Sequence, residues 1–314
     1  MENKNILIIV PMNDEQRARV QQAAPNCAIT YSTPNDVTEE MVQNAEIIIG
    51  NVPAEYIKCS PKLELLQLNS SGADAYVKDG VLNEKTLLAN AAGAYSKAVS
   101  EHMFAMTLAI IKKLHIYRDN QNKCLWQDEG TISSLSDKTV AIVGLGDIGL
   151  SYARMCKAFG SYVIGVKRTV REIPEGVDEV YTNADMDKAL AKADIVLSII
   201  PSTPETRGMF GKAKFDAMKD GAVFLNGGRG DAVNQDDLLE AIKSGKLSAA
   251  GLDVTVPEPL PADHPMWKEK NIFITPHIAG HYHLPETLTR IVNIAIKNLG
   301  LYISGEEITN KVKH

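Results

Sequence analysis

The segment VAIVGLGDIG, residues 140–149, constrains the fold of this chain more than any other segment. An apolar run leads into Gly144-x-Gly146-x-x-Gly149, and a helical pattern follows at once. In such a strand–turn–helix unit the first glycine permits a tight turn, the second lets a phosphate approach the backbone, and the third lets helix and strand pack closely. The helix N-terminus then offers N–H groups and partial positive charge to the phosphate. The motif therefore predicts a doubly wound domain that binds a dinucleotide.

Short apolar runs alternate with helical patterns in two stretches of the chain, which predicts parallel sheets covered by helices on both faces. The strands expected are 5–10, 28–31, 47–50, 65–69, 139–143, 162–166, 195–200, 222–226, 249–254 and 272–275. The helices expected are 14–23, 38–44, 96–118, 147–159, 185–192, 212–218, 235–244 and 285–303. The predicted fold class is α/β, with two Rossmann-like doubly wound domains.

Length and composition agree with this fold and exclude several classes of protein. A chain of 314 residues suits two domains, and its net charge of −6 argues against a nucleic-acid partner. No apolar run approaches the roughly 18 residues of a membrane span, and the run at 6–10 is too short for a signal segment. The four cysteines show no C-x-x-C spacing, which fits a reducing compartment, and we expect a cytoplasmic protein.

The end of the second strand in the dinucleotide unit bears on the choice of cofactor. Sites for NAD usually place an acidic residue there to bind the ribose 2′-hydroxyl. This chain has Lys167, Arg168 and Thr169 instead, with Arg171 close by. Cationic and hydroxyl groups suit a 2′-phosphate, so NADP(H) is the favoured cofactor and NAD(H) the alternative.

Three polar residues follow predicted strands of the second domain: Arg229, Glu258 and His277. Ligands of open α/β sheets bind at the carboxyl ends of the strands, so these residues are expected at one edge. Taken singly, such a histidine is more often structural, and such an arginine or glutamate is more often a solvated surface group. His277, His281 and His283 do not indicate a metal site, because their acidic partners are wrong and the segment follows a strand instead of lying on one helix, and no metal is expected.

The motifs together make the chain similar to a known family. The segments VGLGDIG, PSTPETRG (201–208), NGGRG (226–230), DVTVPEPLP (253–261) and TPHIAG (275–280) resemble those of D-isomer-specific 2-hydroxyacid dehydrogenases of the glyoxylate/hydroxypyruvate reductase type. The stretches 90–103 and 283–312 resemble that family too. The resemblance implies a substrate domain of residues 1–100 and 288–314, into which a dinucleotide-binding domain of residues 101–287 is inserted.

The family's chemistry is a hydride transfer between NAD(P)H and a 2-keto acid or D-2-hydroxy acid. Carried over by motif, Arg229 would bind the substrate carboxylate, His277 would act as acid/base, and Glu258 would orient the imidazole. Expected cofactor contacts are Gly144, Gly146, Asp147, Ile148, Gly149, Lys167, Arg168, Thr169, Pro201, Thr206, Gly228, Asp253 and Gly280. Expected substrate contacts are Ser70, Ser71, Gly72, Tyr95, Arg229 and His277, with His281 and Tyr282 nearby.

Other members of the same broad class remain open at this point. A formate dehydrogenase or a phosphoglycerate dehydrogenase is one alternative, although the latter often carries an additional regulatory domain. A non-catalytic nucleotide sensor of the corepressor type is another. The resemblance implies a homodimer, and the irregular stretch 120–137, with Trp126 and Ile132 as large apolar residues, is the expected interface.

Overall fold

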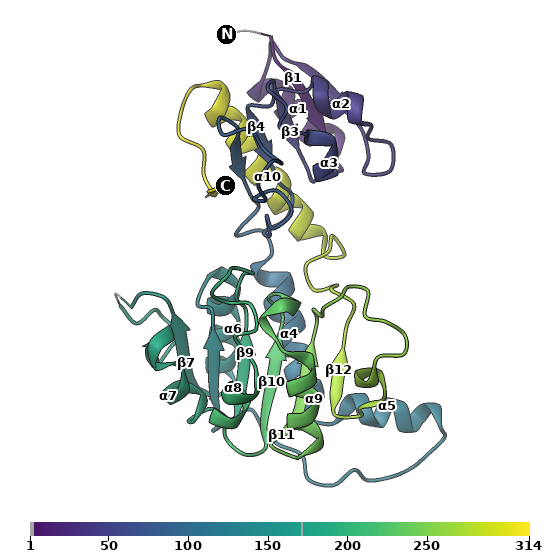
Figure 1. Ribbon diagram of the computed structural model, residues 1–314, viewed down its shortest axis with the longest axis vertical. Helices are drawn as coiled ribbons and strands as arrows, with labels where there is room; N and C mark the ends of the chain where they lie inside the picture. The colour runs from purple at the N-terminus through teal and green to yellow at the C-terminus, as the bar shows by residue number, and fades with distance from the viewer. Residues whose placement is uncertain (1–2, 171) are drawn as a thin grey trace. The chain divides into compact units, whose positions relative to one another are not determined.

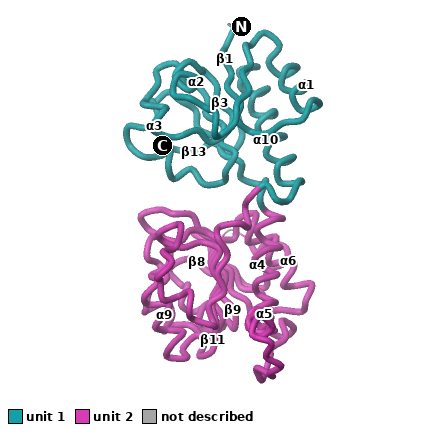
Figure 2. The backbone as a smooth tube through the Cα atoms, turned by 90° about the vertical axis from the view of Figure 1, so that its right-hand side faces the viewer, with its two compact units in different colours: residues 1–95, 282–314 teal, residues 96–281 magenta. Residues whose placement is uncertain are grey.

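The computed structural model describes residues 3–170 and 172–314, so the predicted neighbour of the cofactor, Arg171, lies outside the described residues. The chain divides into two compact units, residues 1–95 with 282–314 and residues 96–281 (Figure 2). The expected domains were 1–100 with 288–314 and 101–287. The first crossing between the units lies at the start of α4 (Ser96–Ile111), and the second lies shortly before α10 (Pro285–Ile303).

Unit 1 is built on a sheet with the strand order β13-β5-β4-β3-β1-β2. The strands are β1 (Asn5–Ile8), β2 (Ala28–Tyr31), β3 (Ile47–Ile49), β4 (Leu65–Gln67), β5 (Leu87–Ala89) and β13 (Lys311–Val312). Neighbouring strands are parallel except that β13 pairs antiparallel with β5. One face carries α1 (Asp14–Ala23) and α10, and the other carries α2 (Glu39–Asn44) and α3 (Ala54–Ile57) (Figure 2).

Unit 2 contains a larger sheet with the strand order β12-β11-β10-β9-β6-β7-β8, in which neighbouring strands are parallel. The strands are β6 (Thr139–Val143), β7 (Tyr162–Lys167), β8 (Glu179–Thr182), β9 (Ile195–Ser198), β10 (Ala222–Asn226), β11 (Leu247–Leu252) and β12 (Ile272–Ile274). One face carries α4 and α6 (Asp147–Ala158), and the other carries α7 (Met186–Leu190), α8 (Lys212–Ala217) and α9 (Gln235–Lys243) (Figures 1 and 2). The predicted α/β fold with two parallel-sheet domains is confirmed.

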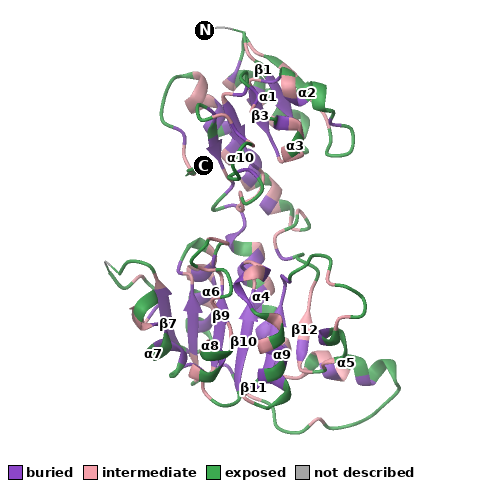
Figure 3. Cartoon of the chain, in the orientation of Figure 1, coloured by how far each residue is buried: buried purple, intermediate pink, exposed green. Residues whose placement is uncertain are grey.

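The strands form the buried centre of each unit, and the helices expose their outer faces (Figure 3). In unit 2 the ring of Phe224 on β10 lies 5.0 Å from that of Phe210 and 5.4 Å from that of Phe215. All three rings are buried, and each contributes roughly 1.5–3 kcal/mol through loss of apolar surface from water. This packing holds the middle strands firmly, so the loops at their carboxyl ends start from a rigid edge.

The prediction of a single long helix over residues 96–118 is wrong. The chain leaves the helix after Ile111, Lys113 adopts a left-handed φ of 57°, and α5 (Leu114–Asn122) starts anew. The Ser133 amide donates to the Ile111 carbonyl at 3.0 Å, and the Lys113 ammonium donates to the Glu129 carbonyl. Bonds from a distant loop therefore satisfy the end of α4, and the apolar periodicity of the helix carries no signal of them.

The short strands β5, β8 and β13 and the short helix α3 were not predicted, because two to four residues carry too little periodicity. Over residues 3–170 and 172–314, no helix has the length and apolar character needed to cross a membrane.

Candidate active site

The glycine motif forms a close-packed turn between β6 and α6. A Cβ atom on Gly144, whose φ is 106°, would lie 2.3 Å from the carbonyl oxygen of Ile199. A Cβ atom on Gly149 would lie 2.1 Å from the carbonyl oxygen of Gly144. A Cβ atom on Gly146, in contrast, would meet nothing within 4 Å. The outer two glycines therefore serve the packing of the turn, whereas Gly146 keeps open space in front of the helix.

A cavity of about 640 Å³ lies in front of this turn, at the carboxyl ends of β6, β7 and β9. Seven predicted cofactor residues line it: Gly144, Gly146, Lys167, Arg168, Thr169, Pro201 and Thr206. Sequence reasoning missed other lining residues: Asn183, Ile199, Ile200, Thr203, Glu205 and Met209. The available signal was strand order, because Ile199 and Ile200 follow β9 at the same edge of the sheet.

The cavity suits a phosphorylated dinucleotide. Gly146 is the N-cap of α6 and has no side chain, so the helix starts without a side-chain acceptor for its first N–H groups. These groups and the helix dipole favour an anion there. Lys167 and Arg168 add positive charge to the same cavity. This set of donors matches the phosphates of a dinucleotide.

Glu205 places a carboxylate in this cavity that the sequence motif had not indicated. A hydrogen bond from Thr203 and, to a smaller extent, the charge of Arg168 hold the pKa of Glu205 below its ordinary value. The side chain therefore stays ionised near neutral pH. It offsets part of the positive charge that Lys167 and Arg168 present.

The other predicted cofactor residues do not line this cavity. Asp147, Ile148 and Gly149 form the first turn of α6. Gly228 packs so closely on the segment after β9 that a Cβ atom would lie 2.6 Å from the carbonyl oxygen of Ile200. Gly280 follows the turn that bears His277. Cofactor contact by these residues stays a prediction.

Glu258 and His277 come together although they are 19 residues apart in sequence. The Nδ1 atom of His277 lies 2.8 Å from Oε2 of Glu258, and the Thr255 amide donates to Oε1 at 3.1 Å. An ionised carboxylate only accepts hydrogen bonds, so the proton of this contact belongs to Nδ1. The side chains are 45% and 39% exposed, and Nε2 of His277 is left for proton exchange with a bound ligand.

The turn after β12 holds His277 in an uncommon backbone conformation. Its φ of 49° lies in the left-handed region, which costs a residue with a Cβ atom about 1–2 kcal/mol. The His277 amide donates to the Asp253 carbonyl at 2.7 Å. The Asp253 carboxylate accepts from the amides of Ile278, at 3.0 Å, and Ala279, at 3.2 Å. Asp253 is 2% exposed, so it anchors the turn, and its predicted contact with the cofactor stays a prediction.

Arg229 follows β10 and starts the short helix η2 (Gly230–Ala232). Its Nη1 donates to the Gly228 carbonyl at 2.9 Å, and its own carbonyl accepts from the fully buried Asn226 amide at 2.9 Å. A Cβ atom on Gly230 would lie 2.1 Å from the Thr255 carbonyl oxygen, so the loops after β10 and β11 touch. These contacts hold the backbone of the half-buried Arg229 in place, so the position from which its guanidinium extends is fixed.

The predicted substrate loop lies in unit 1 after β4. The Ser70 hydroxyl donates to the Gly72 carbonyl at 2.6 Å and accepts from the Asn51 amide at 2.9 Å. Both bonds lie inside the unit, so this hydroxyl holds the loop in shape. The Ser71 carbonyl accepts from the Asn90 amide at 2.8 Å, also within the unit.

Two tyrosines surround Asn69, the residue before this loop. The Tyr95 hydroxyl donates to the Asn69 carbonyl, and the Asn69 amide donates to the Tyr282 hydroxyl. Burial raises the pKa of Tyr282 to about 12, so its phenol stays neutral. The network explains why Tyr95 belongs near the loop.

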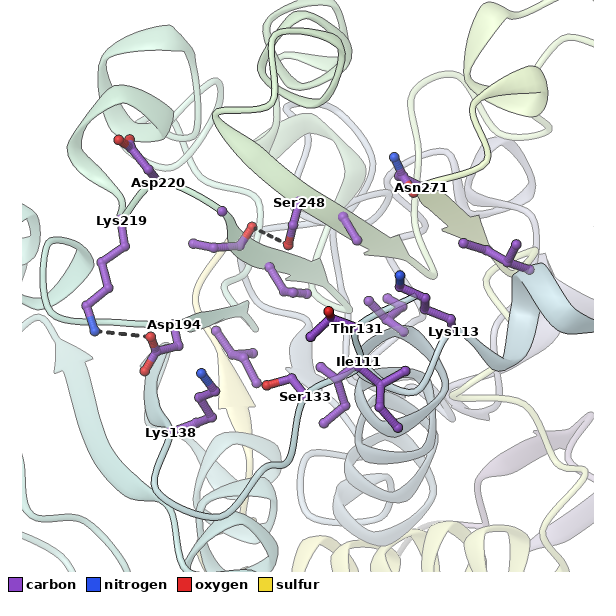
Figure 4. Close-up of a pocket in the computed structure, with 18 of the residues that line it drawn as sticks. Ile111, Lys113, Thr131, Ser133, Lys138, Asp194, Lys219, Asp220, Ser248 and Asn271 are labelled. Carbon is purple, nitrogen blue, oxygen red and sulfur yellow. Dashed lines mark hydrogen bonds and ion pairs between the residues drawn. The ribbon is translucent and has the colours of Figure 1, made fainter. Parts of the chain in front are cut away.

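A separate cavity of about 520 Å³ lies at the opposite edge of the unit 2 sheet (Figure 4). Ile111, Lys138, Asp194, Lys219 and Asn271 are among its lining residues. None of the predicted site residues lines this cavity. The candidate catalytic residues follow the carboxyl ends of the strands instead. Among the residues that the structure describes, no three His, Cys, Asp or Glu side chains are grouped to hold a metal ion.

Unit 2 is a doubly wound domain that has a glycine turn before α6 and a histidine in contact with a glutamate. In sequence, it is inserted between the two halves of a second α/β unit. These features together define the class of two-domain nicotinamide-nucleotide dehydrogenases. Residues 104–279 match the model of the D-isomer specific 2-hydroxyacid dehydrogenase NAD-binding domain. The chain belongs to the D-isomer-specific 2-hydroxyacid dehydrogenase family. It is an NAD(P)-dependent oxidoreductase that acts on CH–OH groups.

Individual relatives agree with this assignment. A family member of known structure from Aeromonas salmonicida is 32% identical, with a TM-score of 0.86 and 99% of each chain covered. The NADPH-dependent glyoxylate/hydroxypyruvate reductase of Sinorhizobium meliloti, in complex with NADP and sulfate, is 25% identical, with a TM-score of 0.83 and coverage of 99% of this chain and 98% of that one. The D-3-phosphoglycerate dehydrogenase of Archaeoglobus fulgidus is 32% identical over 98% of this chain but only 57% of its own length.

Proposed function

We propose that the protein reduces small 2-keto acids to D-2-hydroxy acids, with glyoxylate and hydroxypyruvate as the substrate class. The 2.8 Å contact between His277 Nδ1 and Glu258 Oε2 carries the proposal, because it leaves Nε2 of a charge-stabilised imidazole for proton transfer. The Sinorhizobium meliloti relative, whose name states this activity, supports the substrate class.

The proposed mechanism assigns one task to each residue. Arg229 binds the substrate carboxylate through its planar fork and polarises the 2-oxo group. When bound, the reduced nicotinamide supplies a hydride to the 2-carbon. His277 gives its Nε2 proton to the oxygen that becomes the hydroxyl, and Glu258 stabilises the imidazolium before that step. In the reverse direction, His277 takes the proton from the hydroxyl.

A screen with NADPH tests the function directly. We expect turnover of glyoxylate and hydroxypyruvate, with lower kcat/KM for pyruvate, phenylpyruvate and branched-chain 2-keto acids. A protein that binds NADPH yet reduces none of these acids would instead be a nucleotide sensor. The screen therefore separates the enzyme from the corepressor-like alternative.

The basic end of β7 leads us to propose NADP(H) as the preferred cofactor. We expect a higher kcat/KM with NADPH than with NADH, because Lys167 and Arg168 can pair with a 2′-phosphate. Replacing both by alanine should raise KM for NADPH at least about 10-fold and change KM for NADH little, since each lost charged hydrogen bond is worth about 1.5–3 kcal/mol. Steady-state kinetics with both cofactors measure this.

Two controls sharpen that measurement. Lys188→Ala removes a cation that pairs with Asp185, and it should leave both KM values unchanged. Glu205→Gln removes the opposing carboxylate and should increase the preference for NADPH. Faster turnover of the wild type with NADH would contradict the assignment.

We also propose that the protein is a cytoplasmic homodimer. Its four cysteines are all free, which suits a reducing compartment. Large apolar side chains in the stretch 120–137 are exposed: Leu125 by 46%, Trp126 by 103% and Ile132 by 51%. Such exposure over one segment supports the proposal that the segment packs on a second subunit.

Sedimentation velocity tests the dimer. The wild type should sediment as a dimer at micromolar concentration, and Trp126→Asp should shift it toward the monomer. Ile173→Asp introduces the same charge at a residue that is 57% exposed outside this stretch, and it should not affect assembly. A monomeric wild type would refute the proposal.

A further inference from the structure

A histidine on α4, His102, contacts the structure that anchors the catalytic turn. Its Nε2 lies 3.0 Å from the Thr275 hydroxyl and 3.6 Å from Oδ1 of Asp253. The side chain is 27% exposed, and all three residues belong to unit 2. Neither the mechanism above nor the sequence motifs give His102 a task.

The hydrogen bonds in this group have one consistent direction. The Thr275 hydroxyl lies 2.6 Å from the Asp253 carboxylate, which can only accept, so the hydroxyl donates its single proton there. The hydroxyl oxygen must then accept from His102, which requires a proton on Nε2. A chain therefore runs from His102 through Thr275 to the buried Asp253.

Asp253 connects this chain of hydrogen bonds to His277, the proposed acid/base. Its carbonyl accepts from the His277 amide, and its carboxylate accepts from the amides of Ile278 and Ala279. Three consecutive amides of the turn are thus bound to one residue. The turn sets the direction of the His277 ring toward Glu258.

We propose that His102 is a positioning residue, which keeps His277 aligned with Glu258 through Thr275 and Asp253. The inference rests on the proposed role of His277. Loss of the Nε2 donor frees Thr275 to turn away from Asp253, which loosens the turn and lengthens the contact between Nδ1 and Oε2. The imidazolium then loses the stabilising contact with the Glu258 carboxylate.

Kinetics of paired variants test the chain of contacts. His102→Phe should lower kcat about 10- to 100-fold, the cost of small misplacements of reacting groups. Thr275→Val should do the same, and the double variant should be no worse than either single one, because both remove the same chain. His102→Gln and Thr275→Ser each keep the needed donor or hydroxyl and should restore most of kcat. Glu101→Gln, at an exposed neighbour on α4, is the control and should match the wild type.

An NMR spectrum of the imidazole nitrogens in the cofactor-free protein gives a readout without turnover. Seven histidines are present, and the His277 signal is assigned by its loss in His277→Ala. His102→Phe should shift the Nδ1 resonance of His277, because the contact with Glu258 lengthens, and His102→Gln should leave that resonance in place.

Three outcomes would each overturn the proposal: multiplicative losses in the double variant, an Nδ1 resonance of His277 that His102→Phe leaves unchanged, or a kcat of His102→Gln as low as that of His102→Phe. If His102→Phe does not fold, the two Thr275 variants and the glutamine variant decide it. A wild type that reduces no 2-keto acid would overturn the proposed function instead, and the Nδ1 resonance of His277 would still test the positioning.

Discussion

His277→Ala should lower kcat/KM for 2-keto acid reduction by at least about 10²-fold, with the fold retained. The variant removes the proposed proton donor together with its 2.8 Å contact to Glu258. Arg229→Ala should cause a loss of the same order, because the substrate carboxylate loses its bidentate partner. Steady-state kinetics with saturating NADPH measure both effects.

The matched controls separate chemistry from folding. His283→Ala replaces another histidine after β12 and should leave kcat/KM within about threefold of the wild type, as ordinary surface substitutions do. Circular dichroism and thermal unfolding should show native folds for all three variants. Near-wild-type rates in His277→Ala or Arg229→Ala would refute the assigned role of that residue.

Gly146→Ala should weaken cofactor binding without loss of stability, whereas Gly149→Ala should lower the stability of unit 2. The Cβ atom of Gly146→Ala meets no protein atom within 4 Å, so the free energy of unfolding should change by less than about 1 kcal/mol. It occupies the space in front of α6, and loss of two charged hydrogen bonds, each about 1.5–3 kcal/mol, should weaken cofactor binding at least about 10²-fold. Titration calorimetry with NADPH measures the affinity.

Gly149→Ala should instead destabilise the unit itself. Its Cβ atom would lie 2.1 Å from the Gly144 carbonyl oxygen, and such overpacking costs about 1–3 kcal/mol. Urea unfolding measures this loss. Gly245→Ala, with φ of 78° and no atom within 4 Å, is a control for backbone strain without a clash. If Gly146→Ala bound NADPH as tightly as the wild type, the cavity would not be the cofactor site.

Local patterns were sufficient for most of the sheet and for the glycine turn. The helices Asp14–Ala23 and Pro285–Ile303 and the strand Ala222–Asn226 match their predicted bounds, because each has a clear period and a clear end signal. The split of α4 and α5 was not predictable, since a bond from Ser133 ends the first helix. Glu205 was likewise invisible, because the search for a carboxylate near the cofactor follows β7 and not the loop after β9.

The sequence by itself determined the fold class, the family and the order in which Arg229, Glu258 and His277 occur along the chain. These features depend on periodicity and motifs within short segments. The sequence also determined the basic end of β7. Only the tertiary structure decided that Glu258 meets His277 and that buried Asp253 binds the turn beside it. It also joined α4 to that turn through His102. These contacts span from 19 to 173 positions of the chain, and loop paths and close packing, which no local pattern encodes, bring them together.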